Sequence, residues 1–194
     1  MRIPLASGAW LDYDARWLPP DEADDALAAL RDELTWEQRE ILLFGRRVLQ
    51  PRLIAWAGDL GYRYSGQTLE PRALTPMAAR LLARVRVQTD VPFNHVLLNR
   101  YRSGDDSMGL HADDEPELGP SPLVAIVSLG TARRLVVKPR RKQGRDRQDL
   151  ELGHGALLVM GGTCQHHYVH GVPRQPGTGG ERISLTFRRL LREP

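Results

Sequence analysis

The chain has 194 residues, of which 41% are hydrophobic and 26% are charged, as is ordinary for a globular protein. No apolar run is long enough to span a membrane, residues 1–4 lack the apolar start of a signal peptide, and the single Cys164 excludes an intramolecular disulfide and a multi-cysteine zinc site. We therefore expect a monomeric cytoplasmic protein, with an N-terminal extension, helical and irregular, over residues 1–54 and one domain over residues 55–194.

The net charge of +3 hides an uneven distribution along the chain. Residues 1–60 carry 7 basic and 11 acidic side chains, whereas residues 131–194 carry 13 basic and 5 acidic ones. A polyanionic partner such as a nucleic acid selects a basic surface of this kind, but a solvated surface has the same composition. Charge by itself therefore leaves both interpretations open.

Two helices are predicted in the N-terminal half. Pro20 opens the first, which has four apolar residues at helical spacing and acidic residues in its first turns. Thr75 and Pro76 open the second, because a capping residue followed by proline is typical of a helix start. Residues 1–19 are predicted to be irregular, and Thr35 is predicted to cap a short helical turn.

The second half of the chain changes to the periodicity of β-strands. Short apolar or alternating segments are separated there by clusters of Gly, Pro, Asn and Asp. The predicted strands are residues 93–101, 123–129, 134–138, 156–160, 168–172 and 182–188. Several short strands after N-terminal helices predict an α+β, mainly β fold. We expect a double-stranded β-helix, or jelly roll, with the N-terminal helices packed on one sheet.

Two histidines and one carboxylate in this half form a candidate metal site. His111 and Asp113 are two residues apart, so both side chains point to the same side if one strand carries them. His170 lies on a later predicted strand, and its neighbours His166 and His167 compete for the same role. Such a set is the facial triad of non-haem iron(II), which leaves other metal positions open for reagents. The alternative is that these are ordinary surface or hydrogen-bonded histidines.

An alternating segment near the C-terminus begins and ends with arginine. One face of the predicted strand carries Arg182, Ser184, Thr186 and Arg188. This row suits either a solvent-facing edge strand or a buried anion, and two planar bidentate cations suit a dicarboxylate. Asn99 and Tyr101 similarly place two hydrogen-bonding side chains on one strand face. Together with the triad, these residues predict an oxygenase that uses iron(II), 2-oxoglutarate and dioxygen.

Over roughly residues 55–190 the sequence resembles the AlkB family of iron(II)/2-oxoglutarate dioxygenases, and its DNA-repair branch most of all. The resemblance is carried by residues 62–66, 93–101, 108–115, 128–130, 170–173 and 182–188. It implies that the iron ligands are His111, Asp113 and His170. It implies 2-oxoglutarate contacts from Asn99, Tyr101, Arg182, Ser184 and Arg188. Which arginine meets the distal carboxylate is left open.

The resemblance also implies a substrate pocket and a reaction. Tyr64 would stack on a nucleobase opposite His111, Tyr62 would line the pocket, and Asp114 and Glu115 would contact the base. The reaction would be oxidative demethylation of N1-methyladenine and N3-methylcytosine in DNA, with 2-oxoglutarate converted to succinate and formaldehyde released. Both lesions are cationic, which suits the acidic residues, and their blocked pairing edge lowers the cost of base flipping.

Phosphate contacts are predicted from a basic set in the C-terminal part, with a solvated loop as the alternative. The set is Arg133, Arg134, Arg140, Arg141, Lys142 and Arg145. Other functions stay open: an oxygenase acting on RNA or protein, a non-catalytic nucleic-acid-binding protein, or a zinc hydrolase using the same three ligands. The hydrolase gives no role to Arg182 and Arg188.

Overall fold

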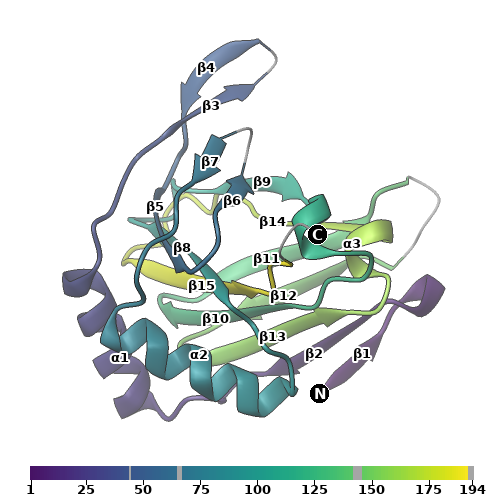
Figure 1. The fold of residues 1–194 in the computed structure, drawn as a ribbon, viewed down its shortest axis with the longest axis horizontal. Coiled ribbons are helices and arrows are strands. Elements are labelled where there is room, and N and C mark those ends of the chain that lie inside the picture. The colour runs from purple at the N-terminus through teal and green to yellow at the C-terminus, as the bar shows by residue number, and fades with distance from the viewer. Residues whose placement is uncertain (44, 65–66, 142–145, 192–194) are drawn as a thin grey trace.

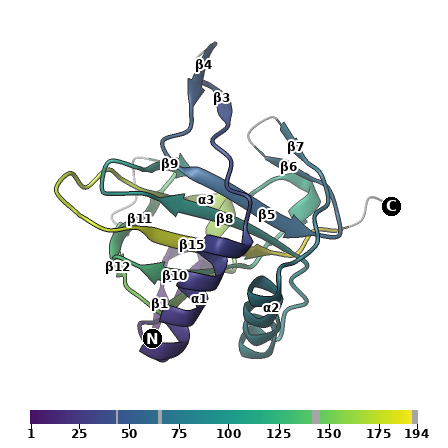
Figure 2. The ribbon, with the colours of Figure 1, turned by 90° about the vertical axis from the view of Figure 1, so that its left-hand side faces the viewer.

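The computed structural model describes residues 1–43, 45–64, 67–141 and 146–191, without the side chains of residues 42, 43, 63, 64 and 67. Two antiparallel β-sheets face each other, and two helices cover the outer face of the larger sheet (Figures 1 and 2). This arrangement confirms the predicted mainly β jelly roll with helices on one sheet. None of the described helices is both long and apolar enough to cross a membrane.

The larger sheet has seven strands in the order β1-β2-β13-β10-β15-β8-β5. Their bounds are β1 Arg2–Pro4, β2 Trp10–Asp14, β5 Leu53–Gly58, β8 His95–Tyr101, β10 Val124–Gly130, β13 Ala156–Gly161 and β15 Arg182–Arg188. The smaller sheet has four strands in the order β12-β11-β14-β9. Their bounds are β9 Met108–His111, β11 Arg133–Pro139, β12 Gln148–Leu152 and β14 Tyr168–Val172.

Shorter elements surround the two sheets. Two hairpins lie at one end of the molecule and project from it in both views (Figures 1 and 2). They are formed by β3 Glu40–Leu43 with β4 Arg46–Leu49, and by β6 Tyr62–Tyr64 with β7 Gln67–Leu69. The single-turn elements are η1 Ala6–Gly8, η2 Pro116–Leu118 and α3 Cys164–His167. Both η2 and α3 lie beside the segment that follows β9, and they become important for the site.

The two long helices begin where the sequence predicts. Helix α1 spans Pro20–Glu33, and α2 spans Pro76–Thr89 with the Thr75 hydroxyl accepting a hydrogen bond from the Ala78 backbone N–H at 3.4 Å. Their buried faces pack on the large sheet through Ala23, Ala26, Leu30, Leu81, Leu82 and Val85. Burying a leucine in this way contributes about 1.5–3 kcal/mol to the stability of the fold, and the helices exclude water from one face of the sheet.

Strand β15 shows how the large sheet separates two environments. It lies between β10 and β8, and all its residues are buried, so the alternative of a solvent-facing edge strand is wrong. Its apolar side chains join the core under the helices: Ile183, Leu185 and Phe187. Its polar side chains face the smaller sheet: Arg182, Ser184, Thr186 and Arg188. The predicted row of polar residues on one strand face is therefore confirmed.

The N-terminal residues depart from the prediction. Residues 1–19 were predicted to be irregular, but β2 pairs with β13 and β1 pairs with β2, which extends the large sheet by two strands. The predicted turn after Thr35 is also wrong, because Glu37 forms a bridge with Ile54 and leads into the β3–β4 hairpin. In both places, pairing with distant strands supplies the backbone hydrogen bonds, and local sequence carries little signal for such pairing.

Strands β9 and β14 approach each other closely at Gly171. A Cβ atom at this position would lie 2.8 Å from the Met108 carbonyl oxygen and 2.9 Å from that of Gly109. We predict that Gly171→Ala lowers the free energy of unfolding by about 1–3 kcal/mol, because the backbone of β9 must move to relieve the clash.

Urea denaturation followed by circular dichroism measures this change. Gly153→Ala is the matched control, since a Cβ there meets nothing within 4 Å. The control should be unchanged or slightly more stable, because alanine restricts the unfolded chain. Equal changes in the free energy of unfolding would show that β9 and β14 can move apart enough to accept a Cβ atom at Gly171.

Candidate active site

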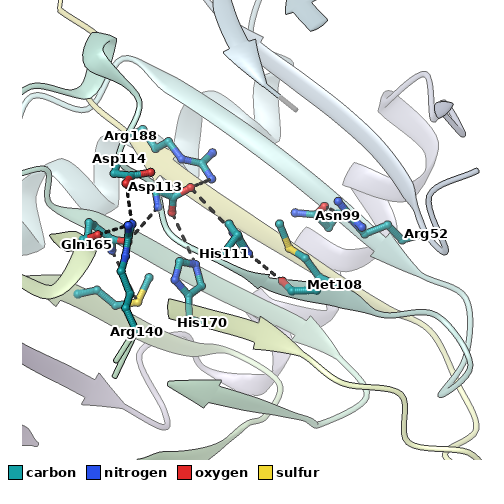
Figure 3. Close-up of polar contacts among 12 residues, drawn as sticks. Arg52, Asn99, Met108, His111, Asp113, Asp114, Arg140, Gln165, His170 and Arg188 are labelled. Atoms are coloured by element: carbon teal, nitrogen blue, oxygen red, sulfur yellow. Dashed lines mark hydrogen bonds and ion pairs between the residues drawn. The ribbon is translucent and has the colours of Figure 1, made fainter. Parts of the chain in front are cut away.

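Three predicted metal ligands come together between the two sheets. His111, Asp113 and His170 each offer one ligand atom, and these atoms lie within 4.8 Å of one another (Figure 3). The Nε2 atom of His170 is 3.6 Å from Asp113 Oδ2, and that of His111 is 4.0 Å from Asp113 Oδ1. Sequence reasoning therefore located this cluster correctly.

Two of the three residues are held by strands and one is not. His111 is the last residue of β9 and pairs directly with His170 on β14. Asp113 lies beyond the end of β9, so the expectation that one strand carries both His111 and Asp113 is wrong. The competing His166 and His167 lie on α3 and are exposed, outside the cluster.

The donor atoms of the cluster fit a metal ion. The Nδ1 atom of His111 lies 3.0 Å from the Gly109 carbonyl oxygen, which suits an Nδ1–H donor and leaves the Nε2 lone pair for a metal. Asp113 Oδ2 is buried and has no hydrogen-bond partner among the described residues. Burial lowers the pKa of His170 to about 3, so its imidazole is neutral, as a ligand must be. Two nitrogens and one oxygen are the donor set of an iron(II) triad.

A buried arginine controls the charge of the carboxylate ligand. Arg188 Nη2 donates to Asp113 Oδ1 at 2.6 Å, and both side chains are 1% exposed. Burial by itself raises the pKa of Asp113, but Arg188 and the two histidines outweigh it and lower that pKa below its usual value. Asp113 is therefore ionised, with Oδ1 occupied by Arg188 and Oδ2 directed toward His170.

A second buried arginine lies along β15 from the triad. Arg182 is 1% exposed, and its Nε donates to the Ser128 hydroxyl at 2.9 Å. Its guanidinium lies 5.2 Å from the centre of the Tyr101 ring, and its Nη1 has no partner within the described part of the chain. This leaves a buried cation with a free hydrogen-bond donor, which can bind an anionic group.

The space between Arg182 and the triad is lined by the predicted 2-oxoglutarate contacts. Asn99, Tyr101, Ser184 and Arg182 all border a small cavity that also touches His111 and His170. Its volume is ≈ 20 Å³, room for about one water molecule. The Tyr101 hydroxyl contacts the Met108 sulfur at 3.8 Å. A five-carbon diacid therefore requires a lining side chain such as Met108 to move aside.

The acidic residues after Asp113 point in different directions. Glu115 interacts with the hydroxyl of the fully buried Tyr62, and burial together with the Asp113 charge raises the pKa of Glu115. Asp114 is exposed instead, and its Oδ2 accepts from Arg140 Nη2 at 2.6 Å (Figure 3). The structure thus places Glu115, and not Asp114, beside Tyr62. The side chain of Tyr64, predicted to stack on the base, lies outside the described residues.

The predicted phosphate contacts are divided by the structure. Arg133 is 2% exposed and donates to the carbonyl oxygens of Ser103, Asp106 and Pro173, so its assignment to phosphate is corrected: it is a structural arginine. Of the others, Arg134 and Arg141 are exposed and Arg140 is shared with Asp114. Lys142 and Arg145 lie outside the described residues.

Sequence reasoning missed three residues that lie close to the site. Arg52 Nε donates to Asn99 Oδ1 at 2.7 Å, and the Oδ1 atom is thereby fixed. Gln165 accepts a hydrogen bond from the backbone N–H of Asp113 at 3.0 Å. His95 is buried opposite Arg188, with its ring 5.0 Å from that of Tyr62. No local pattern marks the first two, whereas a histidine in an apolar strand was a visible signal.

Comparisons with known proteins agree with this geometry. The family model of the 2OG-Fe(II) oxygenase superfamily matches residues 12–188. The chain belongs to this superfamily, in its AlkB family. It is 37% identical over 181 residues to the human alpha-ketoglutarate-dependent dioxygenase alkB homolog 3, covering 89% of this chain and 63% of that protein. It is 36% identical to the DNA oxidative demethylase ALKBH2 of Mus musculus, covering 88% and 76%.

A solved structure supports the fold. The structure of OsALKBH1 superimposes with a TM-score of 0.66 and covers 97% of this chain and 100% of that chain, at 17% sequence identity. The chain spans slightly less than two thirds of the alkB homolog 3 proteins that it matches. Family membership and the triad together indicate a site for iron(II) and 2-oxoglutarate in this AlkB-family chain. The zinc hydrolase alternative is thereby set aside.

Buried His95 gives the stability a pH dependence that can be isolated. Burial, followed by the nearby charge of Arg188, lowers the pKa of His95 from 6.5 to about 3. Between these values the unfolded chain binds the proton and the folded chain does not. The free energy of unfolding therefore falls as the pH falls from 6.5 toward 3, by up to about 1.4 kcal/mol per pH unit.

We predict that His95→Phe removes this contribution and flattens the dependence by about one proton. Urea denaturation of the metal-free protein and of the variant, at several pH values from 5 to 8, measures both slopes. Phenylalanine keeps the ring that packs on Tyr62 and has no buried nitrogen to satisfy, so the variant should also be the more stable at low pH. Identical slopes for the two proteins would mean that His95 is not buried in its neutral form.

Proposed function

We propose that the protein demethylates N1-methyladenine and N3-methylcytosine in DNA by oxidation, and so takes part in the repair of alkylated DNA. The observation that carries the proposal is the iron triad beside a small cavity lined by Arg182, together with the carboxylate of Glu115, which interacts with Tyr62 and lies near Asp113. The similarity to proteins named DNA oxidative demethylases supports this choice over protein or RNA substrates.

The two arginines receive different roles. Arg182 meets the distal carboxylate of 2-oxoglutarate, because it lines the cavity beside the triad, whereas Arg188 does not, and Tyr101 lies against it. In a buried site a bidentate arginine–carboxylate pair is strong and directional. Arg188 is already occupied by Asp113 and holds that ligand in place. Asn99 and Ser184 line the cleft between them.

The protein positions and stabilises the reacting groups, whereas the oxidising power of the reaction comes from the metal, the co-substrate and dioxygen. Iron(II) held by His111, Asp113 and His170, together with 2-oxoglutarate and dioxygen, would supply the oxidation that hydroxylates the N-methyl group, with succinate and carbon dioxide as co-products. The hydroxymethyl product then releases formaldehyde without needing an acid or base from the protein. The contribution of His111, Asp113 and His170 is to hold the metal on one face and leave the other open.

Glu115 is the carboxylate that reads the base. It interacts with Tyr62, and burial together with the charge of Asp113 raises its pKa, whereas Asp114 is held at the surface by Arg140. A cationic methylated base beside Glu115 favours the ionised carboxylate and gains a charge-assisted hydrogen bond, which an unmodified neutral base does not provide. Tyr64 remains the predicted stacking partner.

The nucleic-acid backbone is proposed to contact the exposed part of the basic set. Arg134 on β11 and Arg141 are exposed and can reach phosphates, and the predicted Lys142 and Arg145 follow Arg141 in the sequence. Contacts of this kind would bind DNA and RNA alike and lose strength with salt. Substrate class is therefore decided at the base pocket and by strand geometry, and RNA or protein hydroxylation is the alternative function.

The proposed reaction is tested by its two products. An oligonucleotide with one N1-methyladenine, supplied with iron(II), ascorbate and 2-oxoglutarate, should yield formaldehyde and succinate in equal amounts. Asp113→Ala should reduce both by about 100-fold or more, because the metal loses the one anionic ligand among the three residues of the triad. Asp25→Ala, an exposed acid on α1, is the control.

Each product reports a separate part of the proposal. Succinate without formaldehyde would keep the oxygenase and point to another substrate. Full activity of Asp113→Ala with iron bound would refute the ligand assignment. If the parent protein binds iron but forms neither product, the alternative of a non-catalytic nucleic-acid-binding protein is favoured.

The base-reading role separates Glu115 from its neighbour. We predict that Glu115→Gln lowers kcat/KM for cationic N1-methyladenine about 10-fold more than for a neutral etheno adduct, because only the cation loses a charge-assisted contact. Asp114→Asn should leave the ratio of the two rates unchanged, since Asp114 faces Arg140. Steady-state kinetics on the two oligonucleotides measures the ratio, and the reverse pattern would assign the role to Asp114.

A further inference from the structure

Asp113 is the only ligand of the triad that no strand holds. Strand β9 ends at His111, and η2 begins at Pro116, so the carboxylate ligand is carried by the irregular segment 112–115. Asp113 is nevertheless 1% exposed, and its buried backbone N–H needs a partner that the β-ladder does not supply. Something outside the strands must therefore fix its position.

That partner is the side chain of Gln165. Its Oε1 accepts a hydrogen bond from the Asp113 N–H at 3.0 Å, and the residue is 1% exposed (Figure 3). The other end of the amide, Nε2, lies 3.9 Å from the Met160 sulfur, a weak acceptor. The amide orientation is thus determined by its neighbours, because the opposite orientation would place its NH₂ group against the backbone N–H of Asp113.

Helix α3, which carries Gln165, is attached to the ligand segment in other ways as well. Arg140 Nη2 donates both to Asp114 Oδ2 at 2.6 Å and to the Gln165 carbonyl oxygen at 2.9 Å. The ring of His166 makes a short hydrogen bond with the carbonyl oxygen of Pro120. These contacts form a clamp, made by Arg140, Gln165 and His166, around the segment that presents Asp113.

The base of the clamp is itself fixed. The Thr163 hydroxyl donates to the Ser7 carbonyl oxygen at 2.7 Å, which ties the start of α3 to η1, between β1 and β2. The Arg140 backbone N–H donates to the His167 carbonyl oxygen at 2.8 Å, which ties the end of α3 to the segment after β11. A short helix held at both ends is a rigid support for one buried side chain.

We infer that Gln165 is a positioning residue of the iron site, and that its hydrogen bond to the Asp113 backbone sets the metal affinity. Arg140 supports this contact by joining Asp114 to the backbone of Gln165. Arg188 holds the Asp113 carboxylate and Gln165 holds its backbone, so the two bonds together fix the side-chain orientation. The inference rests on the iron site of the family and not on the proposed DNA substrate.

The size of the effect follows from similar outer contacts in metal sites. Removing a residue that orients a metal ligand usually costs about 10–100-fold in affinity. Losing Gln165 also leaves a buried N–H unpaired, and the segment 112–115 must shift to satisfy it. The same contacts change the interpretation of Arg140, which the sequence assigned to phosphate. In the structure it is exposed but engaged with Asp114 and Gln165.

The test is metal binding and not turnover. Cobalt(II) is titrated anaerobically into the full-length protein, and its visible absorption reports both the affinity and the coordination geometry. Gln165→Leu, which keeps the volume and loses the acceptor, should bind cobalt about 10–100-fold more weakly and with an altered spectrum. Gln165→Glu, which retains an acceptor oxygen at the same position, should restore most of the affinity and the parental spectrum.

A matched control separates positioning from stability. Gln175 Oε1 also accepts a backbone hydrogen bond, from the Arg134 N–H at 2.8 Å, outside the metal cluster. Gln175→Leu should lose stability in urea while keeping the cobalt affinity and spectrum. Parental affinity and spectrum in Gln165→Leu would overturn the inference. Failure of Gln165→Glu to improve on Gln165→Leu would overturn the acceptor role.

A second variant covers the case in which Gln165→Leu does not fold. Arg140→Met removes the bridge between Asp114 and α3 but leaves the Gln165 side chain, and it should weaken cobalt binding about 3–10-fold with circular dichroism unchanged. An unchanged cobalt affinity of Arg140→Met would show that Arg140 does not help to position Asp113. If the parent binds cobalt but releases no formaldehyde from methylated DNA, the proposed substrate fails and the metal titrations still decide the role of Gln165.

Discussion

The buried ion pair between Arg188 and Asp113 is the interaction on which the rest of the site depends. Two fully desolvated charges are costly, and breaking such a pair by removing one partner costs about 3–5 kcal/mol. Here the pair joins β15, an inner strand of the large sheet, to the segment that follows β9 of the smaller sheet, so one contact connects the two layers at the metal site. It also keeps the carboxylate ionised, and it leaves only Oδ2 free for a metal.

The alternation of β15 makes this arrangement possible. Its apolar residues are held by the helices on one side, so its polar residues are fixed in the space between the sheets on the other. The histidine ligands have the same kind of support, because His111 and His170 are paired across neighbouring strands. Asp113 has no such support and is held by side chains, with Arg188 at its carboxylate and Gln165 at its backbone. The least regular ligand therefore has the most specific side-chain contacts.

The sequence predicted those parts of the protein that depend on local periodicity. The limits of β14 and β15, the start of α2 at Thr75 and the shared face of the β15 polar residues all follow from spacing and capping. It did not predict β1 and β2, because a short strand at a sheet edge is stabilised by its partner and not by its own pattern. It assigned Arg133 to the surface, since the sequence of a basic segment does not show which arginine is buried among carbonyl groups.

The sequence by itself determined the three residues of the triad and the polar face of β15, because metal chemistry restricts the residue types that can serve and strand periodicity restricts their spacing. Only the tertiary structure decided which arginine faces Asp113, which acidic residue lies beside Tyr62, and that Arg52 and Gln165 belong to the site at all. The physical reason is that these contacts join residues between 47 and 75 positions apart in the chain. Their partners are set by how two sheets and a one-turn helix pack, and no local pattern records that packing.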